Sequence, residues 1–413
     1  MKCDLRVCSL QLCFFSIRRS SMKMRLGFVV AAMVAMSTVT TANLYGAGWD
    51  AGNGGGAGGN LWSQGLNWDT DAVPASGDKA YLRDTTASAD DTAQIASGTA
   101  AVADKVVIGQ GALGKLIIQD GGSLTTPLIE LGTSGGDGRL TFSYGSTASW
   151  TSDFRIGDEA GTFGQGHARG NNASPTTLTG GGMLVGNQGV GDFTQEGATI
   201  TVNGSFVVGQ SNTGTYDLKE RVAGGPEPSV LTTTSRVKIG DDGNGTFDQG
   251  QNTTWNHTSF RLFIIGESSG EGTYNLAGGT LNITDPAADI NVPRYGTGTL
   301  NQTGGDINTV ASVVVAYGGT GTYNMNGGTL TAVDLSKGGG EGTFNFTDGE
   351  IVLDGNRVGF DAANAWFNVT GNTSLYQEEF LTGSNQTRLH YIPEPSSILM
   401  ILAGAGLLLL RRR

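Results

Sequence analysis

Apolar and polar residues alternate in short runs between glycines over most of the chain. In the stretch Gly321–Leu330, which reads GTYNMNGGTL, Tyr323 and Met325 alternate with Thr322 and Asn324. Alternation of period two, bounded by Gly and Asn, predicts short β-strands. We therefore expect Tyr323 and Met325 to face a core, and Thr322 and Asn324 to face solvent.

Close copies of this stretch recur through two thirds of the chain, at intervals of about 21 to 31 residues, the range typical of solenoids. Each copy carries three short apolar patches, which bury their faces only when successive coils stack. The pattern predicts an all-β fold, a right-handed parallel β-helix of about ten coils and about 45–50 Å in length. The copies start at Gly114, Gly138, Gly161, Gly191, Gly214, Gly245, Gly272, Gly298, Gly321 and Gly342.

The shared phase of the first strand predicts an inner and an outer row of side chains along the solenoid. Burial of the inner row supplies stability at about 25 cal/mol per Å² of apolar surface. The inner row consists of Phe163, Phe193, Tyr216, Phe247, Tyr274, Tyr323 and Phe344, with Leu140 and Leu300 in two coils. Two residues after an inner side chain stand Gln195, Gln249 and Gln302, which we expect to be partly buried and to need partners along the stack.

The outer row is rich in Asn and Asp, and two interpretations of it stand. A ladder of stacked side-chain amides is favoured. The alternative is a repetitive surface for sugar hydroxyls or cations. The members of the row are Asp217, Asp248, Asn275, Asn301, Asn324 and Asn345.

Charge and cysteine content narrow the classes of function. Only 15% of the 413 residues are charged, and the net charge is −12. Residues 43–392 alone hold 16 Lys/Arg and 35 Asp/Glu, a net of −19, which argues against a nucleic-acid partner. Cys3, Cys8 and Cys13 lie near the start of the chain in a spacing that is not a zinc pattern, so we expect no metal site there and no disulfide framework.

The first 42 residues are predicted to be a signal peptide for Sec export. Lys23 and Arg25 precede the apolar run Leu26–Met36, and cleavage is expected near Ala42. Because the preceding segment is long for a signal peptide, translation starting at Met22 or Met24 is an alternative. A non-cleaved anchor is disfavoured because the run is too short to span a bilayer comfortably.

We expect four further segments. Residues 43–101 form a Gly/Trp-rich cap, 102–375 the β-helix repeats, 376–392 a polar connector and 393–413 a tail. In the cap, Trp62 and Trp68 have two interpretations. They cover the open end of the solenoid, which is favoured, or they form a glycan contact by stacking on sugar rings.

Candidates for catalysis are few. His167, His257 and His390 do not occupy equivalent positions of the repeat, and Asp153, with Asp158 and Glu159, forms a generic acidic group. Residues 241–245 (DDGNG) resemble a calcium turn but lack the full loop and its terminal Glu. Two expanded copies, at 167–175 and 219–228, are expected to emerge as surface loops, which are tolerated insertions or sites of specific contact. We therefore predict no enzyme, no cofactor and no metal.

The tail combines Pro393-Glu394-Pro395, the apolar run Ile398–Leu410 and Arg411-Arg412-Arg413. This arrangement resembles the PEP-CTERM sorting signal of Gram-negative bacteria. The resemblance implies a short hydrophobic helix inserted transiently in the inner membrane, with the arginines as its membrane stop, and an exosortase-type enzyme that cuts near the Pro-Glu-Pro. It also implies a link to exopolysaccharide and biofilm matrix.

The repeats are similar to passenger β-helices of autotransporters, and segment 67–80 resembles the entry segment of such repeats. The expectation is an exported, non-enzymatic solenoid that is a structural or adhesive part of the cell surface or extracellular matrix, binding by many weak contacts. The alternatives are a β-helical polysaccharide lyase or hydrolase, and a carbohydrate-binding module that uses Trp62 and Trp68.

Overall fold

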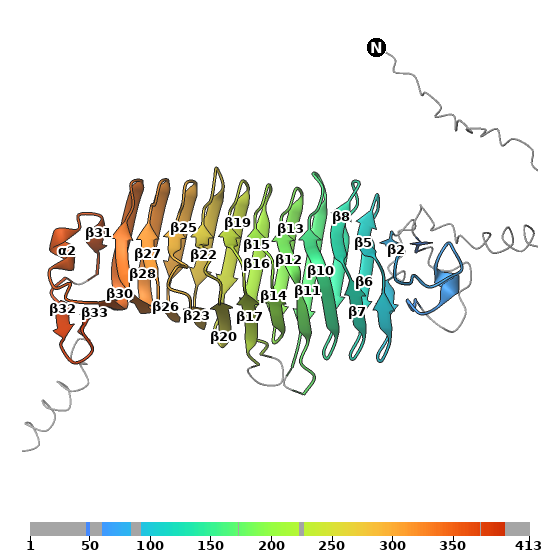
Figure 1. Cartoon of the computed structure of the whole chain (residues 1–413), viewed down its shortest axis with the longest axis horizontal. Coiled ribbons are helices and arrows are strands. Elements are labelled where there is room, and N and C mark those ends of the chain that lie inside the picture. Colours follow the sequence, from blue (N-terminus) through green and yellow to red (C-terminus); the bar gives the residue numbers. More distant parts are fainter. Residues whose placement is uncertain are drawn as a thin grey trace, which may run out of the picture. The chain divides into compact units, whose positions relative to one another are not determined.

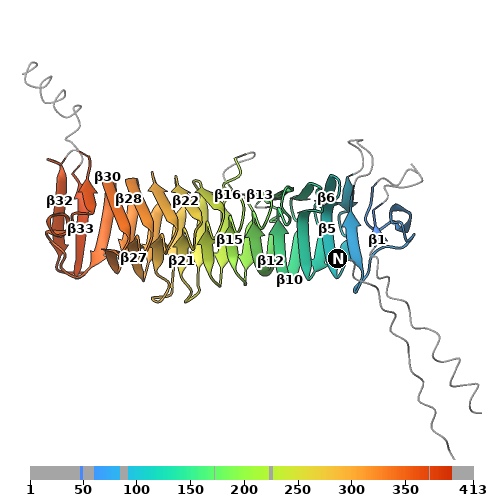
Figure 2. The same ribbon diagram turned by 90° about the horizontal axis from the view of Figure 1, so that it is seen from above.

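A computed structural model of the chain describes residues 47–49, 60–83, 92–171, 173–222, 227–371 and 373–392. The regular secondary structure of these residues is nearly all β-strand, with a 3₁₀ helix η1 (Gly65–Asn67) and a short helix α2 (Phe360–Ala363). The strands stack as a parallel β-solenoid, seen from the side in Figure 1 and from above in Figure 2. The predicted all-β solenoid is confirmed, with about 12 turns instead of ten.

Each turn contributes strands to three parallel sheets. Sheet 1, which begins each repeat, contains β3 (Ala93–Ile95), β6 (Gly114–Ile118), β9 (Gly138–Phe142), β11 (Phe163–Arg169), β13 (Val190–Glu196), β16 (Gly214–Lys219), β19 (Asn244–Gln249), β22 (Glu271–Leu276), β25 (Thr297–Gln302), the first halves of β28 (Thr320–Ala332) and β30 (Glu341–Asp354), and β31 (Phe367–Val369). The count of ten was low because the turns at β3 and β31 lack the Gly-x-apolar start.

Sheet 2 follows after a turn and contains β4 (Ala100–Val102), β7 (Ser123–Thr126), the first halves of β10 (Thr147–Ile156) and β12 (Thr177–Val185), β14 (Thr199–Val202), β17 (Ser229–Thr233), β20 (Thr253–His257), β23 (Thr280–Ile283), β26 (Asp306–Thr309) and the second halves of β28 and β30.

Sheet 3 completes the turn and contains β1 (Ala47–Gly48), β2 (Lys79–Leu82), β5 (Lys105–Gln110), β8 (Leu128–Thr133), the second halves of β10 and β12, β15 (Phe206–Val208), β18 (Val237–Ile239), β21 (Phe263–Ile265), β24 (Ile290–Val292), β27 (Ser312–Val315) and β29 (Asp334–Lys337).

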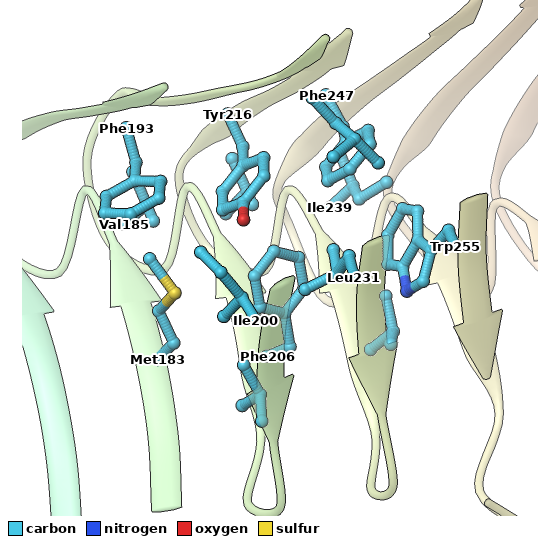
Figure 3. Packing of buried hydrophobic residues seen from close by; sticks show 14 of the residues in the cluster. Met183, Val185, Phe193, Ile200, Phe206, Tyr216, Leu231, Ile239, Phe247 and Trp255 are labelled. Carbon is cyan, nitrogen blue, oxygen red and sulfur yellow. The ribbon is translucent and has the colours of Figure 1, made fainter. Parts of the chain in front are cut away.

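The strands of sheet 1 pair in register, so equal positions of the repeat align. Tyr216 pairs with Phe247, and Phe247 with Tyr274. All three side chains are fully buried. The rings of Phe193 and Tyr216 stack with centroids 5.2 Å apart, and those of Tyr216 and Phe247 with centroids 5.0 Å apart. Figure 3 shows this row facing Met183, Ile200, Leu231 and Trp255 across the core. The predicted inner row is thus confirmed over these turns.

One member of the predicted inner row is wrong. Phe163 is only half-buried, and it pairs with the exposed Val190 instead of with an inner residue. The repeat of this turn begins at Gly164 and not at the expected Gly161, because Gly164 is the residue that aligns with Gly138. Gly166 therefore takes the inner position, and a Cβ there would lie 2.3 Å from Cδ2 of Phe193. The ring of the next turn fills the space that the glycine leaves.

The three glutamines expected inside are fully buried and have partners. Their Oε1 atoms accept hydrogen bonds from tyrosine hydroxyls of the following turn, and their Nε2 atoms donate to backbone carbonyls. The pairs are Gln195 with Tyr216, Gln249 with Tyr274 and Gln302 with Tyr323.

The last coil is covered by a hairpin that the sequence did not predict. Residues expected as a simple connector form β32 (Tyr376–Leu381) and β33 (Gln386–Tyr391), and β33 pairs antiparallel with β30. The carboxylate of Glu378 accepts hydrogen bonds from the backbone N–H groups of Gly359, Phe360 and Asp361 and from the hydroxyl of Tyr376. These contacts hold α2 to the hairpin at the end of the stack (Figure 1).

Candidate functional site

A continuous row of side-chain amides runs along the outer surface of sheet 1. Nδ2 of each Asn donates to the side-chain oxygen of the same position in the preceding turn. The bonds are Asn275 to Asp248 (2.7 Å), Asn301 to Asn275 (2.8 Å), Asn324 to Asn301 (2.9 Å), Asn345 to Asn324 (2.8 Å) and Asn368 to Asn345 (3.3 Å). We call residues 248, 275, 301, 324, 345 and 368 the amide row. The favoured ladder interpretation is confirmed, with Asn368 added.

The row has a direction because every amide donates towards the start of the chain. Its last acceptor is the carboxylate of Asp248, and an anion is a stronger acceptor than an amide oxygen. Hydrogen bonds in such a chain polarise one another, so the carboxylate strengthens the bonds behind it. Asp217 was expected in the row, but it binds Lys219 of its own strand at 2.7 Å instead.

A groove of about 760 Å³ lies along the amide row. Its lining includes no Asp, Glu, Lys, Arg or His, although the chain carries a net charge of −12. One wall is the amide row, and the other is formed by residues two positions further along each strand. The lining residues are Asn275, Ala277, Asn301, Thr303, Asn324, Asn326, Asn345, Thr347 and Thr370.

Tight glycine turns leave this groove open. Three second-wall residues are followed by a Gly-Gly turn into sheet 2. Ala277 is followed by Gly278-Gly279, Thr303 by Gly304-Gly305 and Asn326 by Gly327-Gly328. Gly305 and Gly328 have φ values of +70° and +79°, and a Cβ on Gly328 would lie 2.1 Å from the carbonyl oxygen of Gly305. Because larger residues would distort these turns, no side chain rises beside the groove at these positions.

A second, shorter amide row lies on sheet 2 and was not expected. Asn282 donates to Asn256 at 3.0 Å, and Asn308 donates to Asn282 at 3.3 Å. The signal was an Asn directly after an inward-facing apolar residue at the same position of three repeats, which places the Asn outward: Trp255-Asn256, Leu281-Asn282 and Ile307-Asn308. This row is a second in-register polar array on the same solenoid.

The other half of sheet 1 carries charge where the amide row would continue. His167, Arg169 and Glu196 cluster there: Nε2 of His167 lies 3.2 Å from Oε2 of Glu196 and 3.1 Å from Nε of Arg169. Burial and the Arg169 guanidinium lower the pKa of His167, against the pull of Glu196. Of the three histidines, His167 is in this cluster, while His257 is buried in the core and His390 lies in the terminal hairpin.

The two expanded turns begin beside this cluster. Both connect sheet 1 to sheet 2, after β11 and after β16. Arg221 binds Glu227 at 3.2 Å across the base of the second expanded turn, and its guanidinium lies 4.4 Å from the ring centroid of Tyr144. The described residues of this turn therefore pack back over earlier coils.

Ion pairs line the outer surface of sheet 3. Lys105 binds Glu130 at 2.6 Å, and Arg155 lies 3.7 Å from Glu130 and 3.0 Å from Asp153. Burial raises the pKa of Glu130. Asp241 of the suggested calcium turn is held by Lys238 at 2.8 Å. Within the described part of the chain, no group of three or more His, Cys, Asp or Glu is placed to hold a metal ion.

Trp62 and Trp68 do not form a stacking platform. Both rings are buried, with 1% and 0% of their surface exposed, and they meet edge to face at 76° with centroids 4.8 Å apart. Trp49 packs edge to face on Trp68 in the same way. The less favoured interpretation, a glycan contact at these residues, requires exposed and coplanar rings, whereas both rings are buried and packed edge to face in the cap.

The predicted signal peptide and the sorting residues lie outside the described residues. This applies to Pro393, Glu394, Pro395, Arg411, Arg412 and Arg413. No helix among the residues that the structure does describe is long and apolar enough to cross a membrane.

No protein-family model, no curated protein and no solved structure matches the chain.

Proposed function

We propose that this chain is an exported, non-enzymatic structural or adhesive component of the cell surface or the exopolysaccharide matrix. The observation that supports this function best is the amide row, since five hydrogen bonds join six successive turns into one rigid polar face. A repeated face of this kind presents the same weak contact many times, and many weak contacts together give strong attachment.

Export and sorting belong to the same proposal. The chain enters the Sec pathway through residues 1–42, and its tail inserts transiently in the inner membrane until an exosortase-type enzyme cuts near Pro393-Glu394-Pro395.

The coil is right-handed, as nearly all parallel crossovers are. A body without cysteine after the leader, stabilised without disulfides by contacts between stacked turns, suits an exported protein because its fold needs no oxidant.

The test is the intact mass of the protein from its native host, measured separately for membranes, extracellular matrix and medium. A product starting near Asn43 and ending near Pro395 in the matrix or medium is expected. A chain still ending at Arg413 and held in the inner membrane would refute the sorting part of the proposal.

A second candidate is an enzyme that acts on polysaccharide, and the charged cluster of His167, Arg169 and Glu196 favours it. A half-buried histidine with a lowered pKa beside a carboxylate, flanked by two expanded turns, has the residue types for acid–base catalysis. Release of reducing ends or of unsaturated sugars from a polysaccharide panel, lost in Glu196→Gln, would establish this candidate over the structural function.

A further inference from the structure

The groove beside the amide row repeats the same chemistry along the solenoid axis. Its lining runs from Asn275 to Thr370 and crosses five turns. At about 4.8 Å per turn, this length is about 19 Å. A linear polymer laid along the axis would meet the same pair of groups at each step, and each step is comparable to one sugar ring in an extended chain.

Hydrogen-bonding capacity in the groove is mixed. An amide has two N–H donors and an oxygen that accepts twice. Inside the row, Asn301 and Asn324 each use one N–H and one acceptor position, which leaves each of them one donor and one acceptor for a ligand. A sugar hydroxyl both donates and accepts, so it satisfies both groups. A carboxylate or sulfate only accepts, and it would meet the amide oxygens without a hydrogen to offer.

The charge around the groove also favours an uncharged ligand over an anionic one. The lining itself is neutral, and the row ends at the carboxylate of Asp248. Asp217 aligns with Asp248 in the preceding turn, but its charge is offset by Lys219 at 2.7 Å. An anionic polymer that extends along the row would approach the carboxylate of Asp248 and be repelled, whereas an uncharged polymer would not.

We propose that this groove binds an uncharged polysaccharide, laid along the solenoid axis with about one sugar unit per turn. This inference rests on the proposed function and deepens it, because it names the class of matrix polymer that the rigid face contacts. The remaining donors and acceptors of the amide row hold the hydroxyls, and the second wall at Thr303, Asn326 and Thr347 confines the chain sideways.

The test is native gel electrophoresis of the full chain in gels that contain one polymer each. Hydroxyethyl cellulose, glucomannan and dextran are the uncharged probes, and alginate is the anionic one. We expect at least one uncharged polymer to slow migration, and alginate to have a smaller effect. Slowing by none of the uncharged polymers, or a larger effect of alginate, would overturn the proposal.

Variants of the second wall make the test specific. Thr303→Glu with Thr347→Glu puts two carboxylates in the groove without removing a member of the amide row, and should weaken binding by at least about tenfold. Thr303→Asn, which copies the neighbouring Asn326, should retain binding. Thr179→Glu is the matched control, because Thr179 is an exposed threonine on sheet 2.

If a polymer slowed the migration of the double variant and of the parent chain equally, binding would lie elsewhere on the molecule and the groove would be refuted as the binding site. A parent chain that dimerises in solution, with the double variant monomeric and no polymer slowed, would identify a second copy as the occupant and refute the polysaccharide. Failure here leaves the matrix proposal standing, since that is decided by the location and intact mass of the protein in its host.

Discussion

The hydroxyl of Tyr274 donates a hydrogen bond to Oε1 of Gln249 in the preceding turn, at 2.6 Å, with both side chains buried in the core. Tyr216 with Gln195 and Tyr323 with Gln302 repeat this contact at 2.6 and 2.5 Å. Each bond joins two adjacent turns, so it adds a directional contact to the stacking of rings.

The type of residue at the inner position depends on the residue that the preceding turn places at the glutamine position. Where the inner residue is Phe or Leu instead of Tyr, the position occupied by glutamine in the other turns is apolar. Phe247 follows Leu218, Leu300 follows Leu276 and Phe344 follows Met325. The reason is physical, because a buried hydroxyl or amide without a partner costs about 1–3 kcal/mol.

Tyr274→Phe should therefore lower the free energy of unfolding by about 1–3 kcal/mol, since it leaves Oε1 of Gln249 buried without its donor. Adding Gln249→Leu copies the apolar pairing of neighbouring turns and should recover part of the loss. Urea unfolding of the two single variants and the double variant measures the coupling. Strict additivity would show that the hydroxyl and the amide do not act as a pair.

Asn301→Ala should also destabilise the solenoid, because it removes one bond that Asn301 donates and one that it accepts. The expected loss is about 1–2 kcal/mol for these two half-buried bonds. Asn368→Ala is the control, since Asn368 ends the row with a single bond of 3.3 Å. Amide hydrogen exchange of sheet 1 checks both, and an equal response to the two variants would contradict a continuous row.

Gly166→Ala should cost about 1–3 kcal/mol, the usual range for overpacking a tight core. The added methyl group would lie 2.3 Å from Cδ2 of Phe193. Phe193→Leu, which shortens the facing side chain, should relieve part of this cost. Thermal unfolding of the two single variants and of the double variant tests the idea. An unchanged melting temperature for Gly166→Ala would mean that the ring of Phe193 has room to move.

Trp68→Ala tests whether the tryptophans of the cap serve packing. Trp68 is fully buried, contacts the rings of Trp49 and Trp62, and donates from Nε1 to the carbonyl oxygen of Trp62 at 3.0 Å. Loss of a buried aromatic of this size costs about 3–5 kcal/mol. We expect faster proteolysis of the first coils and unchanged migration in polysaccharide gels. If Trp68→Ala weakened polysaccharide binding while the cap stayed intact, the result would support the alternative interpretation that these tryptophans contact sugar rings.

Stability should fall with acid because of His257. This side chain is fully buried, with Nε2 2.7 Å from the carbonyl oxygen of Arg261 and Nδ1 3.0 Å from Oγ1 of Thr233. Burial lowers its pKa below the ordinary value of 6.5, although the Arg261 carbonyl and Asp285 act in the other direction. The unfolded chain then binds the proton first as the pH drops. The contribution of His257 to the free energy of unfolding is therefore largest above about pH 6.5. It declines as the pH falls below this value, until the pH has passed the lowered pKa of His257 in the folded state.

Melting temperatures measured between about pH 7.5 and 5.5 check this expectation, because most carboxylates titrate below that range. His257→Gln should flatten the slope. His167→Gln is the comparison, and it should flatten the slope less because His167 is only partly buried. A slope that stays unchanged in His257→Gln would assign the acid sensitivity to other groups.

Much of this molecule was predictable from local pattern. Alternation around Tyr323 and Asn324 separated core from surface, and the repeat interval predicted the solenoid, because in a parallel in-register stack equal positions of the repeat become neighbours. The same logic predicted the amide row and the buried glutamines. The turn at Gly164 was misplaced because its inner residue is a glycine, which carries no apolar signal.

The sequence by itself determined the repeat, the rows along it and the excess of acid, since each of these depends on residue type at a fixed spacing. The tertiary structure alone decided which part of the outer surface of sheet 1 forms an open groove and which part is covered by charged side chains. The groove beside Asn301 is lined by uncharged residues and bordered by glycine turns, whereas Arg169 and Glu196 form an ion pair on the matching surface near His167. The tertiary structure also decided that the rings of Trp62 and Trp68 pack edge to face in the cap together with Trp49, because ring packing is set by the volume available in the folded cap and not by spacing along the chain.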